Sequence, residues 1–209
     1  MLPAKAIDAP TLELIKSLQS KPYLQGFYLA SGTALALNLG HRKSIDIDLF
    51  SNFSFDASEL LEQIHQDFPY QLFFTASSTL KGSIENINVD ILAHRYPLLG
   101  NPDVILGITM LSAPDIIAMK LNAISTSCQR SKDFIDIYYL LNNYNLAEML
   151  EFYQKKYTQK NLSFILESLI YFDDVDLAAW PVLIENPTLK WVDVKRRMEK
   201  VVMDYAHHA

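Results

Sequence analysis

The most informative pattern in the sequence lies in the stretch Gly40-His-Arg-Lys-Ser-Ile-Asp-Ile-Asp-Leu-Phe50. Apolar and polar residues alternate in its second half, with Asp46 and Asp48 on the polar side. Since residues i and i+2 of a strand point the same way, the alternation predicts a strand over residues 43–50 that carries two carboxylates side by side. Aspartate is depleted in strands, because its side chain competes with the backbone, so a pair in one strand indicates a specific role.

Two carboxylates held this close repel each other unless a cation or protons intervene. Magnesium prefers oxygen ligands and is usually bound by one or two carboxylates together with substrate phosphates. The pair Asp46 and Asp48 therefore predicts a magnesium site. On the pair alone, an ordinary solvated strand face stays open as the alternative.

Ser31-Gly32-Thr33 follows the apolar stretch 26–30, which predicts a buried strand, and precedes a predicted short helix over 34–39 that Gly40 ends. A turn at a helix N-terminus presents backbone N–H groups to an anion. Fourteen positions separate Gly32 from Asp46, which is enough for a short helix and a returning strand. We therefore expect a phosphate-binding turn beside the acidic pair, with a plain capped turn as the alternative.

Asp90 is the third acid of interest. It lies in Ile87-Asn-Val-Asp-Ile91, which has the same apolar alternation with an outward aspartate. If this predicted strand adjoins residues 43–50, three carboxylates meet, as they do in two-metal phosphoryl chemistry.

The remaining pattern divides the chain into two parts. Before residue 110 it predicts a helix over 55–67 and strands over 70–75, 79–84, 87–93 and 104–110. After Ser112 it predicts helices over 113–124, 132–141, 146–157, 162–172 and 189–206. We expect an α+β protein: a mixed β-sheet with flanking helices in a catalytic domain of residues 1–110, then a helical domain of residues 111–209 that completes the active site.

Composition limits the classes of partner. The chain of 209 residues has a formal net charge of −6, which counts modestly against a large polyanionic partner and not against a metal-chelated nucleotide. It has no apolar run of 18 residues, so the sequence predicts no membrane span. Cys128 is the only cysteine, so no intramolecular disulfide is possible, and we expect a cytoplasmic protein.

Four motifs in this order resemble the AbiEii/AbiGii toxin family of nucleotidyltransferases and together cover most of residues 27–141. They are Leu29-Ala-Ser-Gly-Thr-Ala-Leu-Ala-Leu37, the stretch Gly40 to Phe50, Pro114-Asp-Ile-Ile-Ala-Met-Lys120 and Arg130-Ser-Lys-Asp-Phe-Ile-Asp-Ile-Tyr138. The resemblance implies a polymerase-β-like nucleotidyltransferase core that uses a nucleoside triphosphate and Mg²⁺, with two ions expected and Mn²⁺ as a substitute.

The resemblance also assigns roles to single residues. The metal ligands are Asp46 and Asp48, to which the strand pattern adds Asp90, and Asp133 is a catalytic acid of the second half. The phosphate loop is Ser31, Gly32 and Thr33, where the family often has glycine in place of Ser31, and Lys120 is the nucleotide-binding lysine. Arg42, in the basic turn before the acidic strand, is interpreted as a further substrate-binding residue.

Three functions stay open at this point. The first is a toxin of a toxin–antitoxin or phage-defence system, with an antitoxin partner and an RNA acceptor, since some family members modify the acceptor end of tRNA. The second is the same chemistry on a small molecule such as an aminoglycoside, which suits the acidic charge. The third is a nucleotide-binding module without turnover, against which the complete set of three acids argues.

Overall fold

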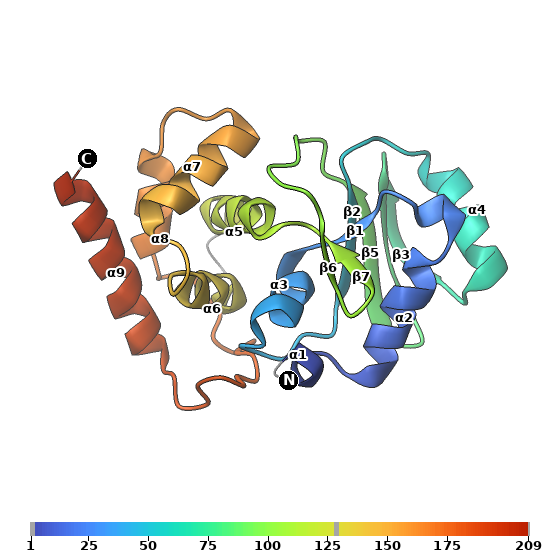
Figure 1. Ribbon diagram of the computed structural model, residues 1–209, viewed down its shortest axis with the longest axis horizontal. Helices are drawn as coiled ribbons and strands as arrows, with labels where there is room; N and C mark the ends of the chain where they lie inside the picture. The colour runs from blue at the N-terminus through green and yellow to red at the C-terminus, as the bar shows by residue number, and fades with distance from the viewer. Residues whose placement is uncertain (1–2, 128–129, 209) are drawn as a thin grey trace.

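The computed structural model describes residues 3–127 and 130–208. A mixed sheet with its flanking helices forms one half of the molecule, and the helices α5 to α9 form the other (Figure 1). Within the described residues the sheet has seven strands in the order β3-β4-β5-β2-β1-β7-β6. The strands are β1 Tyr28–Leu29, β2 Ile47–Ser51, β3 Gln71–Ala76, β4 Thr79–Ile84, β5 Ile87–Ala93, β6 Asp103–Ile105 and β7 Ile108–Met110.

The neighbouring strands β2 and β5 run parallel and carry the acidic residues. Their register places Asp48 opposite Asp90. The residues that precede these two acids, Ile47 and Val89, are fully buried on the opposite face of the sheet. Because side chains alternate along a strand and this register is in phase, the carboxylates of Asp48 and Asp90 share one face.

Helices flank the sheet in the first half of the chain. They are α1 Pro3–Ala6, α2 Ala9–Gln19, the 3₁₀ turn η1 Pro22–Leu24, α3 Ser31–Leu39 and α4 Ala57–Asp67. The carboxylates of Asp8 and Asp56 accept hydrogen bonds from the first-turn N–H groups of α2 and α4, which satisfies donors that a helix start leaves open. Gly40 ends α3 in the left-handed conformation, at φ 69°.

The helical half contains α5 Ala113–Ser127, α6 Ser131–Leu140, α7 Leu146–Tyr157, α8 Ser163–Ile170 and α9 Trp191–His208. A capping box of Asn145 and Glu148 starts α7. The helix α3 packs on both α5 and α6, and the buried apolar residues of the two halves form one continuous core. None of the described helices is long and apolar enough to cross a membrane.

This architecture confirms the predicted α+β class, with a mixed sheet, flanking helices and a helical second half. The predicted bounds of β4, β5 and α7 agree with the structure. The division at residue 110 stays a prediction.

Two predicted strands differ from the structure. The predicted strand 104–110 is a hairpin, because Leu106 and Gly107 both adopt positive φ, at 53° and 79°, and turn the chain between β6 and β7. Leucine is rare at positive φ, which hid this turn. The predicted strand 43–50 begins only at Ile47, because the backbone N–H groups of Lys43 and Ser44 donate to the carbonyls of Val182 and Ala6 outside the sheet.

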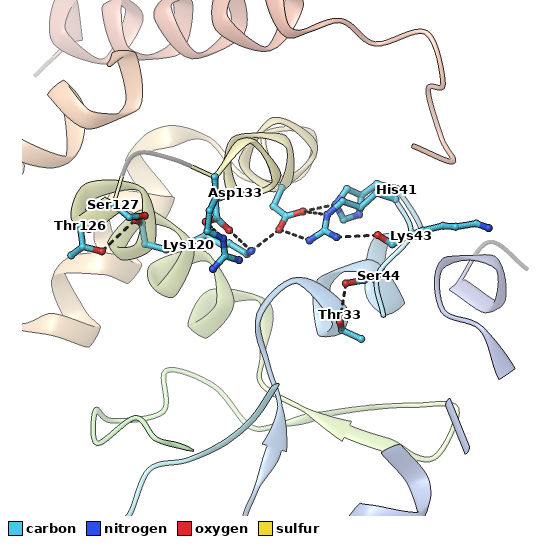
Figure 2. A network of polar contacts seen from close by, with 12 residues as sticks. Thr33, His41, Lys43, Ser44, Lys120, Thr126, Ser127 and Asp133 are labelled. Carbon is cyan, nitrogen blue, oxygen red and sulfur yellow. Dashed lines mark hydrogen bonds and ion pairs between the residues drawn. The ribbon is translucent and has the colours of Figure 1, made fainter. Parts of the chain in front are cut away.

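A buried ionic network, which we call the Asp136 network, joins the two halves (Figure 2). Asp136 lies on α6, its side chain is 0% exposed, and it accepts two hydrogen bonds from the Arg42 guanidinium, at 2.7 and 3.0 Å. Nε2 of His41 lies 2.8 Å from the same carboxylate. Nζ of Lys120, on α5, lies 2.6 Å from Asp136 and 2.6 Å from Asp133. Two cations are thus balanced by two carboxylates inside the protein.

The charge state of the network follows from its partners. Burial alone would raise the pKa of Asp136, but Arg42 and Lys120 outweigh burial and hold that pKa well below its ordinary value. Burial likewise lowers the pKa of Lys120, and the carboxylates of Asp133 and Asp136 more than reverse this effect. Arg42, Lys120 and Asp136 are therefore charged at neutral pH.

A second buried ion pair fastens α7 to the start of α5. Nζ of Lys156 lies 2.6 Å from Asp115 and donates to the carbonyl of Pro97. The Asp115 carboxylate also accepts hydrogen bonds from the Ser112 hydroxyl and the Leu99 N–H group. The loop that leaves β5 is thereby held against the helical half.

We expect Asp136→Ala to lower the free energy of unfolding by about 3–5 kcal/mol, because it leaves the buried Arg42 without its carboxylate partner and removes one of the two partners of Lys120. Urea denaturation at neutral pH measures the change. The control is Glu151→Ala, which removes an exposed ion pair with Lys155 and should change stability by no more than about 0.5 kcal/mol. Equal losses in the two variants would contradict the proposed importance of the network.

Candidate active site

A pocket of about 560 Å³ lies over the polar face of β2 and β5. Asp46, Asp48 and Asp90 line it from the sheet, and Asn88 lies beside them. It is also lined by Ser31 at the start of α3 and by residues 130–132 at the start of α6. The pocket therefore has an acidic floor and walls that contain two helix N-termini.

The three predicted acids are brought together in this pocket, each half-buried. The Asn88 amide donates to Asp46 at 3.1 Å, and Nζ of Lys81 lies 3.4 Å from Asp90. None of the basic side chains that the structure describes lies this close to Asp48. Its pKa is raised to about 6, by burial first and then by the charge of Asp90, while a hydrogen bond from Ser31 opposes the rise.

These residues fit a divalent cation. Burial and, after it, the charge of Asp90 raise the pKa of Asp48, and a bound cation would favour the charged carboxylate against both effects. Among the described residues, no three acidic, histidine or cysteine side chains form a ready-made metal cluster. Magnesium suits such a site, because it usually takes one or two carboxylates and completes its shell with phosphates and water.

Only Ser31 of the predicted phosphate loop lines the pocket with its side chain. It adopts a φ of 60°, in the left-handed region that glycine adopts without strain. No side chain caps α3, so its first-turn N–H groups lack a side-chain partner at the pocket wall. A non-glycine residue held in this conformation is a feature of functional sites.

Gly32 and Thr33 contribute structure instead of direct side-chain contacts to the pocket. A Cβ atom at Gly32 would overlap Nη2 of Arg42, so the glycine allows the arginine to pack against the helix start. The Thr33 hydroxyl hydrogen-bonds to Ser44 at 2.8 Å (Figure 2) and to the backbone carbonyl of Asp46. Thr33 thus holds the backbone that carries the first acid.

Arg42, Lys120 and Asp133 belong to the Asp136 network. The guanidinium of Arg42 is 3% exposed and donates to Asp136 and to the Lys43 carbonyl. This geometry does not support the prediction that Arg42 binds nucleotide, because the guanidinium is buried and each of its three nitrogens already donates a hydrogen bond within the protein. Lys120 and Asp133 line a smaller pocket of about 280 Å³ that shares Ser31, Phe50 and Arg130 with the first pocket.

Several pocket residues were not predicted to belong to the site. Asn88 was detectable, because it lies two residues before Asp90 on the same polar side of a strand. Lys81 depends on the pairing of β4 with β5, and Asp176 reaches the pocket through a long loop, so neither has a local signal. Arg130 and Lys132 lie at the start of the fourth motif quoted above, but no role was predicted for them.

Comparison with known proteins adds the family. The model of the family described as "Nucleotidyl transferase AbiEii toxin, Type IV TA system" matches residues 83–207, more than half of the chain. The match includes Asp90, Lys120 and Asp133, whereas Asp46 and Asp48 precede it. An uncharacterized protein of Aquifex aeolicus is 32% identical over 199 residues, which is 92% of this chain and 94% of that protein.

Two solved structures share the fold. MenT4, a nucleotidyltransferase toxin of Mycobacterium tuberculosis, is 13% identical, with a TM-score of 0.57 over 97% of this chain and 89% of its own. JHP933 of Helicobacter pylori is 17% identical, with a TM-score of 0.54 over 94% of this chain and 92% of its own. The fold agrees with the matched family model, and the chain belongs to the AbiEii family of nucleotidyltransferase toxins.

Proposed function

We propose that this nucleotidyltransferase is magnesium-dependent and transfers a nucleotide from a nucleoside triphosphate to an acceptor hydroxyl. The observation that carries the proposal is the pocket that Asp46, Asp48 and Asp90 line together with two helix N-termini. Acids hold metal and helix N-termini attract phosphate, so the pocket is complementary to a metal-chelated triphosphate.

Each side of the pocket has its own part in the reaction. Asp46 and Asp48 would hold magnesium, which would supply charge neutralisation for the phosphates and a lower pKa for the acceptor hydroxyl. Asp90 provides a third carboxylate for a second ion, or accepts the proton that the acceptor hydroxyl loses. The acceptor oxygen forms a bond to the α-phosphorus, and pyrophosphate leaves with the electron pair of the broken bond.

The Asp136 network positions this machinery. Lys120 binds Asp133 and Asp136 at the same time and fixes α6 against α5. Asp133 has one carboxylate oxygen, Oδ2, without a hydrogen-bond partner in the described structure, and the residue lines the smaller pocket. We propose that Asp133 acts there as the acid of the second half, and that Lys120 orients it and balances its charge.

RNA, with tRNA as one candidate, is the acceptor class that we propose first. Its support is membership of a toxin family together with the basic side chains of Lys81, Arg130 and Lys132 at the pocket. The family description also supports an antitoxin protein as partner, and nucleoside triphosphate as substrate supports action in the cytoplasm. The net charge of −6 favours the second candidate, a cationic small molecule such as an aminoglycoside.

The acceptor can be identified directly. The protein is incubated with each labelled nucleoside triphosphate and magnesium, with total cellular RNA in one series and an aminoglycoside panel in the other. We expect label in RNA with one preferred triphosphate. Label confined to the small molecules would replace the RNA proposal, and no transfer in either series would support a binding module without turnover.

We expect Asp46→Asn and Asp48→Asn to abolish the magnesium-dependent part of triphosphate binding, because each removes a carboxylate from the pocket floor. Isothermal titration calorimetry with a non-hydrolysable triphosphate, with and without magnesium, measures this part. Asp103→Asn, at an exposed acid on β6, is the matched control and should bind as the wild type does. Equal binding by all the proteins would remove the metal from the proposal.

Asp90→Asn separates a working enzyme from a nucleotide binder, because it preserves the shape of the side chain and removes its charge and basicity. We expect triphosphate affinity within a factor of a few of the wild type and transfer lowered by about 100-fold or more. Single-turnover transfer at saturating triphosphate measures the rate, again with Asp103→Asn as control. Wild-type transfer by the Asn variant would place Asp90 outside the reaction.

A further inference from the structure

The N-terminus of α6 forms part of the wall of the pocket that the three carboxylates also line. Arg130, Ser131 and Lys132 all line the pocket there. The helix is 10 residues long, and no side chain caps it, since Arg130 occupies the capping position without a capping hydrogen bond. An uncapped helix start carries partial positive charge and attracts anions.

Ser131 gives a second and independent indication of a ligand. It is 0% exposed, and its hydroxyl has no hydrogen-bond partner among the residues that the structure describes. Buried hydroxyls are nearly always hydrogen-bonded. Because this one lies on the pocket wall, an oxygen atom of a ligand in the pocket is the partner that it lacks.

The cations at this wall differ from those of the Asp136 network. Lys132 forms no hydrogen bond or ion pair with the described residues, and the Arg130 side chain is 59% exposed, with only its Nε 3.4 Å from Asp133. Lys120 and Arg42, by contrast, are buried and bound to carboxylates. Arg130 and Lys132 are therefore the positive charges on this wall that a ligand can meet.

One residue of the pocket wall, Asp176, carries a negative charge and would repel a nearby anion. Asp176 lines the same pocket, and its carboxylate accepts a hydrogen bond from the Ala178 N–H group in its own turn. The backbone of Asp176 forms a β-bridge with Arg130, so this acid lies beside the helix start, where the two cations Arg130 and Lys132 outnumber it.

We propose that the N-terminus of α6, with Arg130, Ser131 and Lys132, binds the β- and γ-phosphates of the triphosphate. This inference rests on the proposed function and adds the direction in which the substrate lies. When the bond between the α-phosphorus and its bridging oxygen breaks, the electron pair goes to the departing pyrophosphate. The charge that develops there is stabilised by Arg130, Lys132 and the helix start.

Pyrophosphate with magnesium is the direct probe, because it carries the proposed ligand group without a nucleoside. Calorimetry compares the wild type with Arg130→Ala/Lys132→Ala and with Ser131→Ala. We expect the double variant to bind pyrophosphate at least about tenfold more weakly and Ser131→Ala about threefold more weakly, the scale of lost charge-assisted and neutral hydrogen bonds. A nucleoside monophosphate, which lacks the two terminal phosphates, should bind equally to all three proteins.

The matched control removes the same charges elsewhere. Arg196→Ala/Lys200→Ala deletes one arginine and one lysine from the exposed side of α9, where they pair with Asp193 and Asp204. It should bind pyrophosphate within about twofold of the wild type. Equal weakening in both double variants would show an effect of net charge and overturn the site, as would a wild type that binds no pyrophosphate. Circular dichroism confirms that the variants are folded.

The site and the proposed function fail separately. Selective loss of pyrophosphate binding in Arg130→Ala/Lys132→Ala supports the site even if no acceptor is ever labelled. If transfer occurs and the double variant keeps the wild-type KM for triphosphate, the enzyme stands and the phosphate site is wrong.

Discussion

The ion pairs of the Asp136 carboxylate hold the two halves of the molecule together. Asp136 lies on α6 in the second half of the chain, yet it binds Arg42 from the turn before β2 and Lys120 from α5. These contacts join the segment that carries Asp46 and Asp48 to the helix whose start lines the same pocket. The network therefore holds two parts of the pocket lining in fixed positions.

Buried charges of this kind are weak evidence for stability as such, because desolvation offsets most of the attraction. The contribution of these buried charges is to fix the orientation of the groups that they join. A bidentate guanidinium–carboxylate pair has one good orientation, whereas apolar side chains of similar volume would pack in several. The network thus selects one arrangement of α3, α5 and α6, and Thr33 extends the constraint to the backbone of Asp46.

The sequence predicted the strands of the site and their polar faces, but it did not predict how these strands pair in space. Alternation around Asp48 and Asp90 is local, so both strands and their polar faces were evident before the structure. That β2 lies parallel to β5, with these two acids in register, depends on long-range pairing that one sequence does not reveal. For the same reason the basic turn was interpreted as a substrate contact, since the partner of Arg42 is 94 residues away.

The close packing of Arg42 on Gly32 has a consequence for substitutions at both positions. A side chain at position 32 would displace the guanidinium, and Asp136 would then lose its strongest partner. Positions 32, 42 and 136 are thus structurally coupled, by a steric contact between the first two and an ion pair between the last two. A change at one of them disturbs the packing of the other two, and a chain without the arginine would have no steric need for glycine at position 32.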